Sequence, residues 1–233
     1  MIDISIHFKD LIFKEESHTY WLNDKQLPSV SSLLKKFAIP FDEKNALKYS
    51  AKKLGVSEQT LKDSWTKINK EACDKGHTIH EFAELYNNDC LKPSRIEELA
   101  VIQYYMNLPK HILPLFVELR VYYKDLYAGT FDGLMYNTLT GKYILYDWKT
   151  NKDIHKNYNG QMLLSPFDDL LDTPLHKYYI QLNLYKKAIE QYLEIEHMEI
   201  VYLKPNIDNY PMLYQTFTVP NLEHKLKQYF NET

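Results

Sequence analysis

An α/β fold in one domain, with a helical section ahead of the sheet, is predicted for this sequence. Helical periodicity fills residues 42–108, three strand-like runs follow up to residue 148, and a helix, two strands and a terminal helix complete the chain. The 233 residues suffice for one sizeable core and are few for two ordinary domains. We therefore expect a hairpin and helical section over 1–114 and a catalytic α/β core over 115–233.

Turn and capping residues divide the N-terminal section. The residues Glu15-Glu16-Ser17 form a suitable turn, Ser57 a suitable helix N-cap and Pro93 a suitable helix start. The elements expected are a β-hairpin over 11–22, a helix from Pro28-Ser29 through Phe37, and a helical region from Asp42 to about Leu108 with new starts at Ser57 and Pro93.

Strand-forming residues predominate after Leu115. The strands expected are 116–123, 130–136 and 143–148, and a turn-rich segment over 137–142 joins the last two. A helix over about 176–193, strands over 199–203 and 213–219, and a last helix capped by Pro220-Asn221 follow. The order indicates a mixed sheet with helices packed against it.

Composition excludes several classes of protein. The net charge of −3 gives no global positive field, which argues against a purely electrostatic binder of nucleic acid. Arg95 and Arg120 are the only arginines, so phosphate contacts would come mostly from lysines. Cys73 and Cys90 are too few for an iron–sulfur cluster, a four-cysteine zinc site or a disulfide framework, which favours a reducing, cytoplasmic setting. We find neither a secretory signal nor an apolar run near the roughly 20 residues that span a bilayer.

Two carboxylates and a lysine end the second and third strands. Asp147 and Lys149 share one face of a strand, and the apolar run before them would bury both charges at its end, which is costly unless they are used or paired. A turn centred between Leu139 and Thr140 places Asp132 directly opposite Asp147, about 4.5–5.5 Å away, where like charges destabilise a sheet. A divalent cation between them would remove the repulsion. A shifted register, which could turn the two side chains to opposite faces, is the alternative.

Two further pairs have helical i, i+4 spacing. His80 and Glu84 would share one face of the first helical region, either as a site or as a solvated surface pair. Gln181 and Tyr185 would share a face of the later helix, either facing a ligand or with Tyr185 in the core.

The order of these motifs resembles that of a known family. Gly76-x-x-x-His80-x-x-x-Glu84, then Glu118, Gly129-x-x-Asp132, Asp147-x-Lys149 and Gln181-x-x-x-Tyr185 resemble the RecB-like exonuclease branch of the PD-(D/E)XK nuclease superfamily. The segments 18–20 and 28–30 are similar to those of phage exonucleases and of the mitochondrial genome maintenance exonucleases in that branch. Phe131 stands where the superfamily name has proline, and the cysteines that hold an iron–sulfur cluster in CRISPR-associated relatives are lacking.

The resemblance implies a restriction-endonuclease-like core, a mixed central sheet flanked by helices, and a role for each matching residue. Mg²⁺ or Mn²⁺ would be held by Asp132, Asp147, His80 and the carbonyl of Trp148, while Lys149 would orient or help to deprotonate the attacking water. Glu84 and Glu118 would touch the metal through water or orient neighbours. Gln181 and Tyr185 would hold DNA or the periphery of the metal site. Because the chain is acidic overall, DNA would need a local groove of lysines, and the candidates near the site by sequence are Lys75, Lys149, Lys152 and Lys177, with Tyr178 and Tyr185 as aromatic contacts.

We therefore expect a metal-dependent DNA exonuclease in phage-type or mobile-element recombination, replication or DNA processing. Single-stranded or frayed ends are the expected substrate, with recombination or replication proteins as partners, in the host cytoplasm if the gene is a phage gene. A structure- or site-specific endonuclease on the same fold and a catalytically silent binding module are the alternatives. Hydrolysis of glycosides by a carboxylate pair would leave the lysine and the histidine unexplained.

Overall fold

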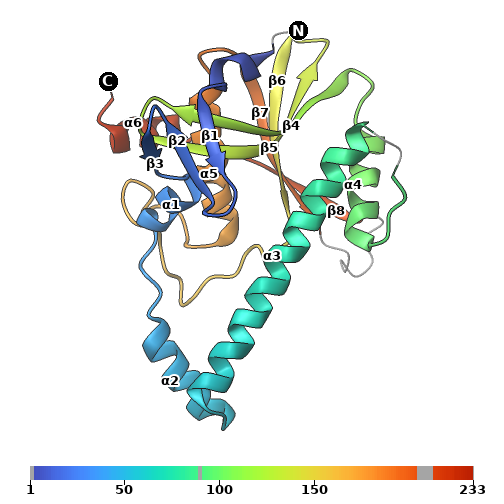
Figure 1. Cartoon of the computed structure of the whole chain (residues 1–233). Coiled ribbons are helices and arrows are strands. Elements are labelled where there is room, and N and C mark those ends of the chain that lie inside the picture. Colours follow the sequence, from blue (N-terminus) through green and yellow to red (C-terminus); the bar gives the residue numbers. More distant parts are fainter. Residues whose placement is uncertain (1–2, 89–90, 204–211, 233) are drawn as a thin grey trace.

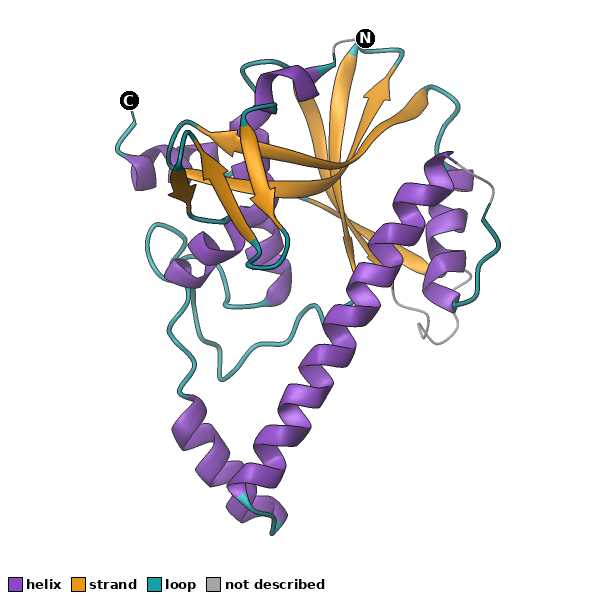
Figure 2. Cartoon of the chain, viewed as in Figure 1, coloured by secondary structure: helices purple, strands orange, loops and turns teal. Residues whose placement is uncertain are grey.

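A five-stranded mixed sheet forms the centre of the molecule. The computed structural model describes residues 3–88, 91–203 and 212–232. The sheet has the order β4-β5-β6-β7-β8, and β6 and β7 are parallel while the other neighbours are antiparallel (Figure 2). Its strands are β4 (Ile112–Tyr123), β5 (Tyr127–Asn137), β6 (Lys142–Lys149), β7 (Ile195–Leu203) and β8 (Tyr214–Thr218). The prediction of a mixed α/β fold is confirmed.

Helices cover both faces of this sheet (Figure 1). The helices are α1 (Val30–Leu34), α2 (Glu43–Leu54), α3 (Glu58–Asn88), α4 (Ile96–Asn107), α5 (Pro174–Ile189) and α6 (Glu223–Phe230). One apolar cluster joins α1, α5 and α6 to the sheet through residues such as Leu33, Leu184 and Leu226. A second cluster joins the later part of α3 and α4 to the other face through Ile79, Val101 and their neighbours. None of the helices among the described residues combines the length and apolar character needed to cross a bilayer.

A small N-terminal sheet packs beside β5. Its strands are β1 (Leu11–Lys14), β2 (Thr19–Leu22) and β3 (Lys25–Leu27), in that order. The first two are the predicted hairpin, but β3 was not expected. Asn23 and Asp24 both adopt positive φ, at 48° and 62°, which is the backbone of a two-residue hairpin turn. The sheet is tied to the core by the Ala128 N–H, which donates to the Pro28 carbonyl at 3.0 Å.

A helical arm extends away from the sheet. Figure 1 shows α3 running from its contact with α4, beside the sheet, to a distant hairpin with α2. Gly55 ends α2 at a φ of 67°, and Ser57 accepts the Thr60 N–H at 3.0 Å, so that α3 begins where the N-cap signal predicts. Leu47, Ala51 and Leu61 form a small core of the arm.

The β5–β6 hairpin has the predicted register. Gly133 pairs with Tyr146, and the ladder continues to Asn137 opposite Lys142. The same register carried one residue further sets Asp132 against Asp147. Other boundaries differ from expectation: β4 begins at Ile112, and β7 begins at Ile195 because the parallel ladder with β6 starts there.

Candidate metal centre

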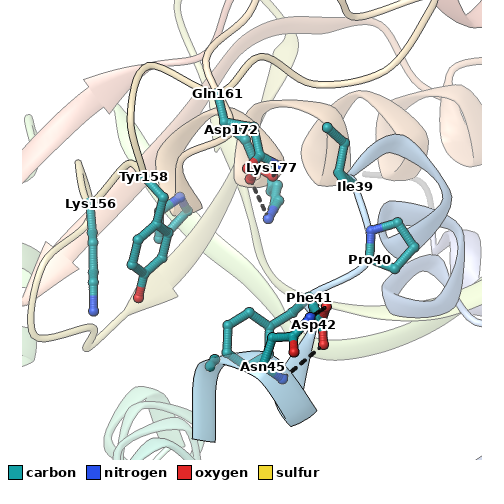
Figure 3. Close-up of a pocket in the computed structure, with 12 residues that line it drawn as sticks. Ile39, Pro40, Phe41, Asp42, Asn45, Lys156, Tyr158, Gln161, Asp172 and Lys177 are labelled. Carbon is teal, nitrogen blue, oxygen red and sulfur yellow. Dashed lines mark hydrogen bonds and ion pairs between the residues drawn. The ribbon is translucent and has the colours of Figure 1, made fainter. Parts of the chain in front are cut away.

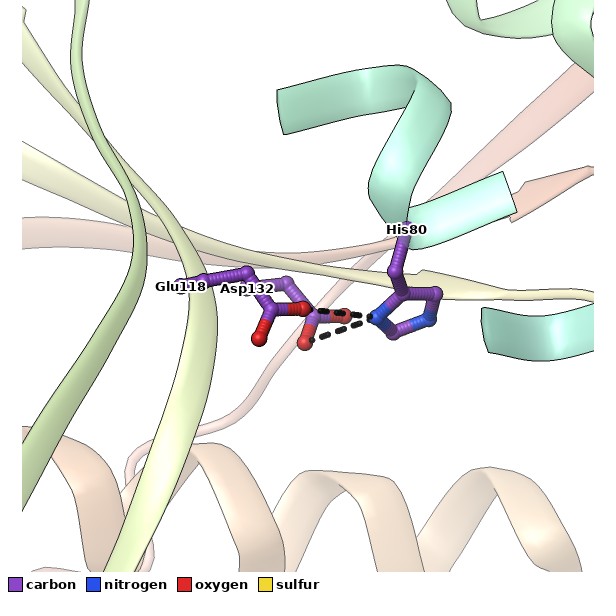
Figure 4. Close-up of side chains that lie close together, drawn as sticks. All are labelled: His80, Glu118 and Asp132. Atoms are coloured by element: carbon purple, nitrogen blue, oxygen red, sulfur yellow. Dashed lines mark ion pairs between the residues drawn. The ribbon is translucent and has the colours of Figure 1, made fainter. Parts of the chain in front are cut away.

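Three side chains from three elements meet beside the middle of β4 and β5. His80 comes from α3, Glu118 from β4 and Asp132 from β5 (Figure 4). Nδ1 of His80 lies 3.3 Å from Oδ1 of Asp132 and 3.4 Å from Oε1 of Glu118. One ligand atom of each residue lies within 4.8 Å of the others. The spacing is close enough for one ion to bridge all three.

Glu118 reaches this group from an unusual backbone conformation. Its φ is 59°, although the pairs on both sides, Val117 with Gly133 and Leu119 with Phe131, keep the regular ladder. A left-handed conformation costs a residue with a Cβ atom about 1–2 kcal/mol. Strain of this kind is concentrated at functional sites, where the surrounding structure holds it in place.

Asp147 and Lys149 lie beside this group at the end of β6. The Asp147 side chain is fully buried and forms an ion pair with Lys149, whose side chain is 13% exposed. Oδ2 of Asp147 faces the Lys149 ammonium, whereas Oδ1 has no hydrogen-bond partner among the described residues. Asp147 therefore offers one buried oxygen atom whose capacity to accept is unused.

The two aspartates differ in their electrostatic state. Burial would raise the pKa of Asp132, but His80, Lys149 and the Trp148 N–H, which donates to Oδ2 at 2.8 Å, lower it to about 2. Burial and the charge of Asp132 raise the pKa of Asp147 to about 7. In the metal-free protein Asp132 is thus a carboxylate at neutral pH, and Asp147 is partly protonated because of that neighbouring charge.

In the metal-free protein, the protonated imidazole of His80 supplies the positive charge between the carboxylates. Burial disfavours the charged imidazole, but Asp132 and Glu118 raise the pKa of His80 to about 10. A metal ion requires a neutral imidazole, so binding would release this proton. Carboxylate oxygens with one imidazole nitrogen, and the free Oδ1 of Asp147, make a donor set suited to a divalent cation.

A cavity of about 790 Å³ opens onto this centre. His80, Lys149 and Tyr178 line it, together with Lys75 and Lys152. Two of the lysines that the sequence suggests for DNA, Lys75 and Lys152, therefore line this cavity. Lys75 also forms an ion pair with Glu97, so part of its charge is neutralised.

Tyr178 fixes the position of Lys149. The Lys149 ammonium lies 4.5 Å from the centroid of the Tyr178 ring, a cation–π distance. The Tyr178 hydroxyl donates to the Asn151 side chain at 2.7 Å, and the Tyr202 hydroxyl donates to the Asn151 carbonyl at 2.8 Å. The sequence predicts Tyr178 only as a contact for DNA, whereas in the structure it packs on the lysine.

Tyr185 lies in the core, so its ring is not exposed for stacking bases. Its side chain is 3% exposed, and the Gln181 amide donates to its hydroxyl at 3.4 Å. A Cβ atom on Gly129 would lie 2.7 Å from the Tyr185 ring, so this glycine makes room for the tyrosine. Gly129 and Tyr185 are thus packing partners, and Gln181 supports them from the same helix.

Two other predicted residues lie outside the centre. Glu84 is exposed on α3 and does not belong to the three-residue group, because the carboxylate that approaches His80 is that of Glu118. Lys177 pairs with Asp172 at 2.5 Å and lines a different cavity. Glu118 was expected near the metal from the motif order alone, and the β4–β5 register, which sets it opposite Asp132, gives the structural reason.

No protein-family model matches this chain. No curated protein sequence matches it either. The geometry of the site and the motifs of the sequence are therefore the grounds for a functional conclusion.

Proposed function

We propose that this protein is a metal-dependent nuclease that hydrolyses phosphodiester bonds in DNA, an exonuclease of the RecB-like branch of the PD-(D/E)XK superfamily. The observation that carries the proposal is the buried pair Asp132 and Asp147, one residue beyond the last pair of the β5–β6 ladder, with His80 against one carboxylate and Lys149 against the other. The mixed sheet flanked by helices is compatible with such a core.

Mg²⁺ or Mn²⁺ is the cofactor that suits the donor set. His80, Glu118, Asp132 and Asp147 would hold the ion, and the Trp148 carbonyl, next to Asp147 in β6, would add an oxygen. Bound there, a divalent ion makes a water molecule a better nucleophile and offsets charge on the phosphate.

Lys149 would act on water and phosphate. Burial disfavours its charge, but Asp147 and Asp132 hold the pKa of Lys149 above its ordinary value, so the ammonium is a cation and a hydrogen-bond donor at neutral pH. A charge held in position by Tyr178 can orient the attacking water and stabilise the negative charge of the pentavalent phosphorus. In the metal-free protein Lys149 is a donor, and a basic role would require loss of its proton on metal binding.

Local charge would attract the substrate. The chain carries a net charge of −3, yet Lys75, Lys149 and Lys152 line the cavity at the metal centre. The expected substrate is single-stranded DNA or a frayed end, in phage-type or mobile-element DNA processing in the cytoplasm. Exonuclease action is the form that the RecB-like motif order favours over an endonuclease.

Cleavage of linear and circular single-stranded DNA, with Mn²⁺ and with EDTA, tests the proposal. We expect Mn²⁺-dependent degradation of the linear strand alone. Lys149→Ala should reduce the rate about 100-fold or more, the usual cost of one transition-state donor, and leave Mn²⁺ affinity unchanged. Lys142→Ala is the matched control, because Lys142 begins the same strand and pairs with Glu194 at 2.5 Å, outside the cavity.

The outcomes separate the alternatives. Cleavage of the circle would indicate an endonuclease, and the absence of cleavage of any DNA with Mn²⁺, and with Mg²⁺ in its place, would refute the nuclease. Equal loss of activity in Lys149→Ala and Lys142→Ala would show that the assay reports folding, and the role given to Lys149 would then fail.

A further inference from the structure

A second cavity, of about 660 Å³, lies between the start of α2 and the segment that joins β6 to α5. In Figure 3, Lys156 and Tyr158 form one side, Ile39 and Pro40 the other, and Phe41 lies near the start of α2. The volume is within the range of about 300–1,000 Å³ typical of small-molecule sites. None of the residues of the metal centre lines this second cavity.

Aromatic rings are unusually exposed at the second cavity. The Phe41 side chain is 69% exposed and the Tyr158 side chain 61% exposed. The ring of Phe41 contacts Trp65 of α3, with centroids 6.3 Å apart, which holds it at the edge of the arm. Planar, solvent-exposed rings at a concave site suit a planar ligand that stacks on them.

The charges at the second cavity favour an anion. Its two carboxylates are already engaged: Asp42 caps α2, and Asp172 pairs with Lys177. Lys156 forms no ion pair with a carboxylate of the described residues, and its ammonium lies 5.1 Å from the centroid of the Tyr158 ring. The arm over 43–75 holds eight lysines against five acidic residues, in a chain whose net charge is −3. A planar group that carries negative charge is the complementary ligand.

The same two elements, α5 and the segment after β6, contribute residues to both cavities. Lys177 lines the second cavity, while the next residue, Tyr178, lines the metal cavity. The segment after β6 likewise contributes Lys152 to the metal cavity and Lys156 to the second one. A strand that leaves the metal centre along this segment therefore meets the exposed rings.

We propose that the second cavity binds an unpaired nucleobase of single-stranded nucleic acid, stacked on Phe41 and Tyr158, with Lys156 beside a phosphate. The inference rests on the proposed function, because the base belongs to the strand whose phosphodiester bond lies at the metal centre. Bases in a duplex have their faces covered by neighbouring bases, so the rings select an unpaired strand.

Binding of fluorescent oligothymidylates in EDTA, where no strand is cut, tests this site. The probes run from a dinucleotide to about 16 nucleotides, the upper site size of single-strand-binding folds. Tyr158→Ala and Phe41→Ala should each weaken binding of the longest probe about fivefold or more, the effect of losing one stacked base, and leave the dinucleotide unchanged. Tyr158→Phe should restore binding because the ring remains.

Tyr49→Ala is the matched control. Tyr49 is also an exposed aromatic residue of α2, at 71%, but it does not line the second cavity, so its loss should change nothing. Tyr158 lies in a loop, so Tyr158→Ala is the variant less expected to disturb the fold. The Tyr158 variants therefore keep the test valid if Phe41→Ala unfolds the arm.

The proposal is overturned if Tyr158→Ala binds the longest probe as tightly as the wild type does. It is also overturned if the substitution weakens binding of the dinucleotide, or of a blunt duplex, as much as it weakens binding of the longest probe. Saturable binding of thymidine monophosphate that depends on Tyr158 would point to a free nucleotide as the ligand and would also overturn it. Cleavage with Mn²⁺ is scored separately. If the wild type cuts no DNA but the length-dependent loss is found, the nuclease proposal fails and the nucleobase site stands.

Discussion

Asp147→Asn should stabilise the metal-free protein at alkaline pH and abolish its metal binding. Burial and the charge of Asp132 raise the pKa of Asp147 from 3.8 to about 7. The folded protein therefore retains a proton that the unfolded chain loses near pH 4. The stability that this proton provides is complete below about pH 4 and is lost as the pH rises through about 7. An asparagine does not titrate, so the variant should lack this loss.

The magnitude follows from the size of the pKa difference. Three pKa units correspond to about 4 kcal/mol of unfolding free energy. That value is an upper limit, because the substitution leaves the buried Lys149 without its ion-pair partner. We expect the variant to gain about 1–3 kcal/mol relative to the wild type between about pH 5 and about pH 8.

Urea unfolding in EDTA at these two pH values measures the gain in unfolding free energy of the variant over the wild type. A second series, with Mn²⁺ in place of EDTA, measures how much the metal stabilises each protein. Mn²⁺ at 100 times its dissociation constant should stabilise the wild type by about 2.7 kcal/mol and the variant by much less. Asp125→Asn, at a 66% exposed carboxylate before β5, is the control. If the difference between variant and wild type is the same at both pH values, or if Mn²⁺ stabilises both equally, the reasoning about Asp147 is wrong.

Three further predictions concern other contacts. Gly129→Ala should lower the free energy of unfolding by about 1–3 kcal/mol, because the added methyl group overpacks against the Tyr185 ring. The double variant Gly129→Ala/Tyr185→Leu should recover part of this stability, and additive losses in thermal unfolding would contradict the packing role. Tyr178→Leu should lower kcat at unchanged Mn²⁺ affinity, while Tyr178→Phe keeps the ring and most of the activity. If the two variants have the same kcat, Tyr178 does not position Lys149. Burial would raise the pKa of Glu232, but hydrogen bonds from Lys187, Tyr123 and Lys124 hold this pKa at about 2. The ionised carboxylate therefore stabilises the fold above about pH 4.5, and this stabilisation is lost as the pH falls through about 2. Glu232→Gln should thus destabilise the protein by about 1 kcal/mol at neutral pH, and an equal effect at about pH 2 would refute this.

Local patterns were enough for much of the fold. Ser29 and Ser57 cap helices where their sequence context predicts, because an N-cap needs only its own next three residues. The β5–β6 register follows from one short turn and the alternation of apolar residues, and it pairs Gly133 with Tyr146, next to Asp132 and Asp147, as expected. The strand β3 was missed because its three residues are too few for a pattern.

The sequence by itself determined most of the elements, the hairpin register and the carboxylate–lysine end of β6, since these depend on neighbours along the chain. Only the tertiary structure decided which carboxylate meets His80. Helical spacing pairs it with Glu84, but the packing of α3 against the sheet turns His80 toward Glu118 and Asp132. Tyr185 shares a helix face with Gln181, yet the ring of Tyr185 packs in the core, in the space that the missing side chain of Gly129 leaves. Burial and contacts between distant segments depend on how elements pack together, and no local pattern encodes that.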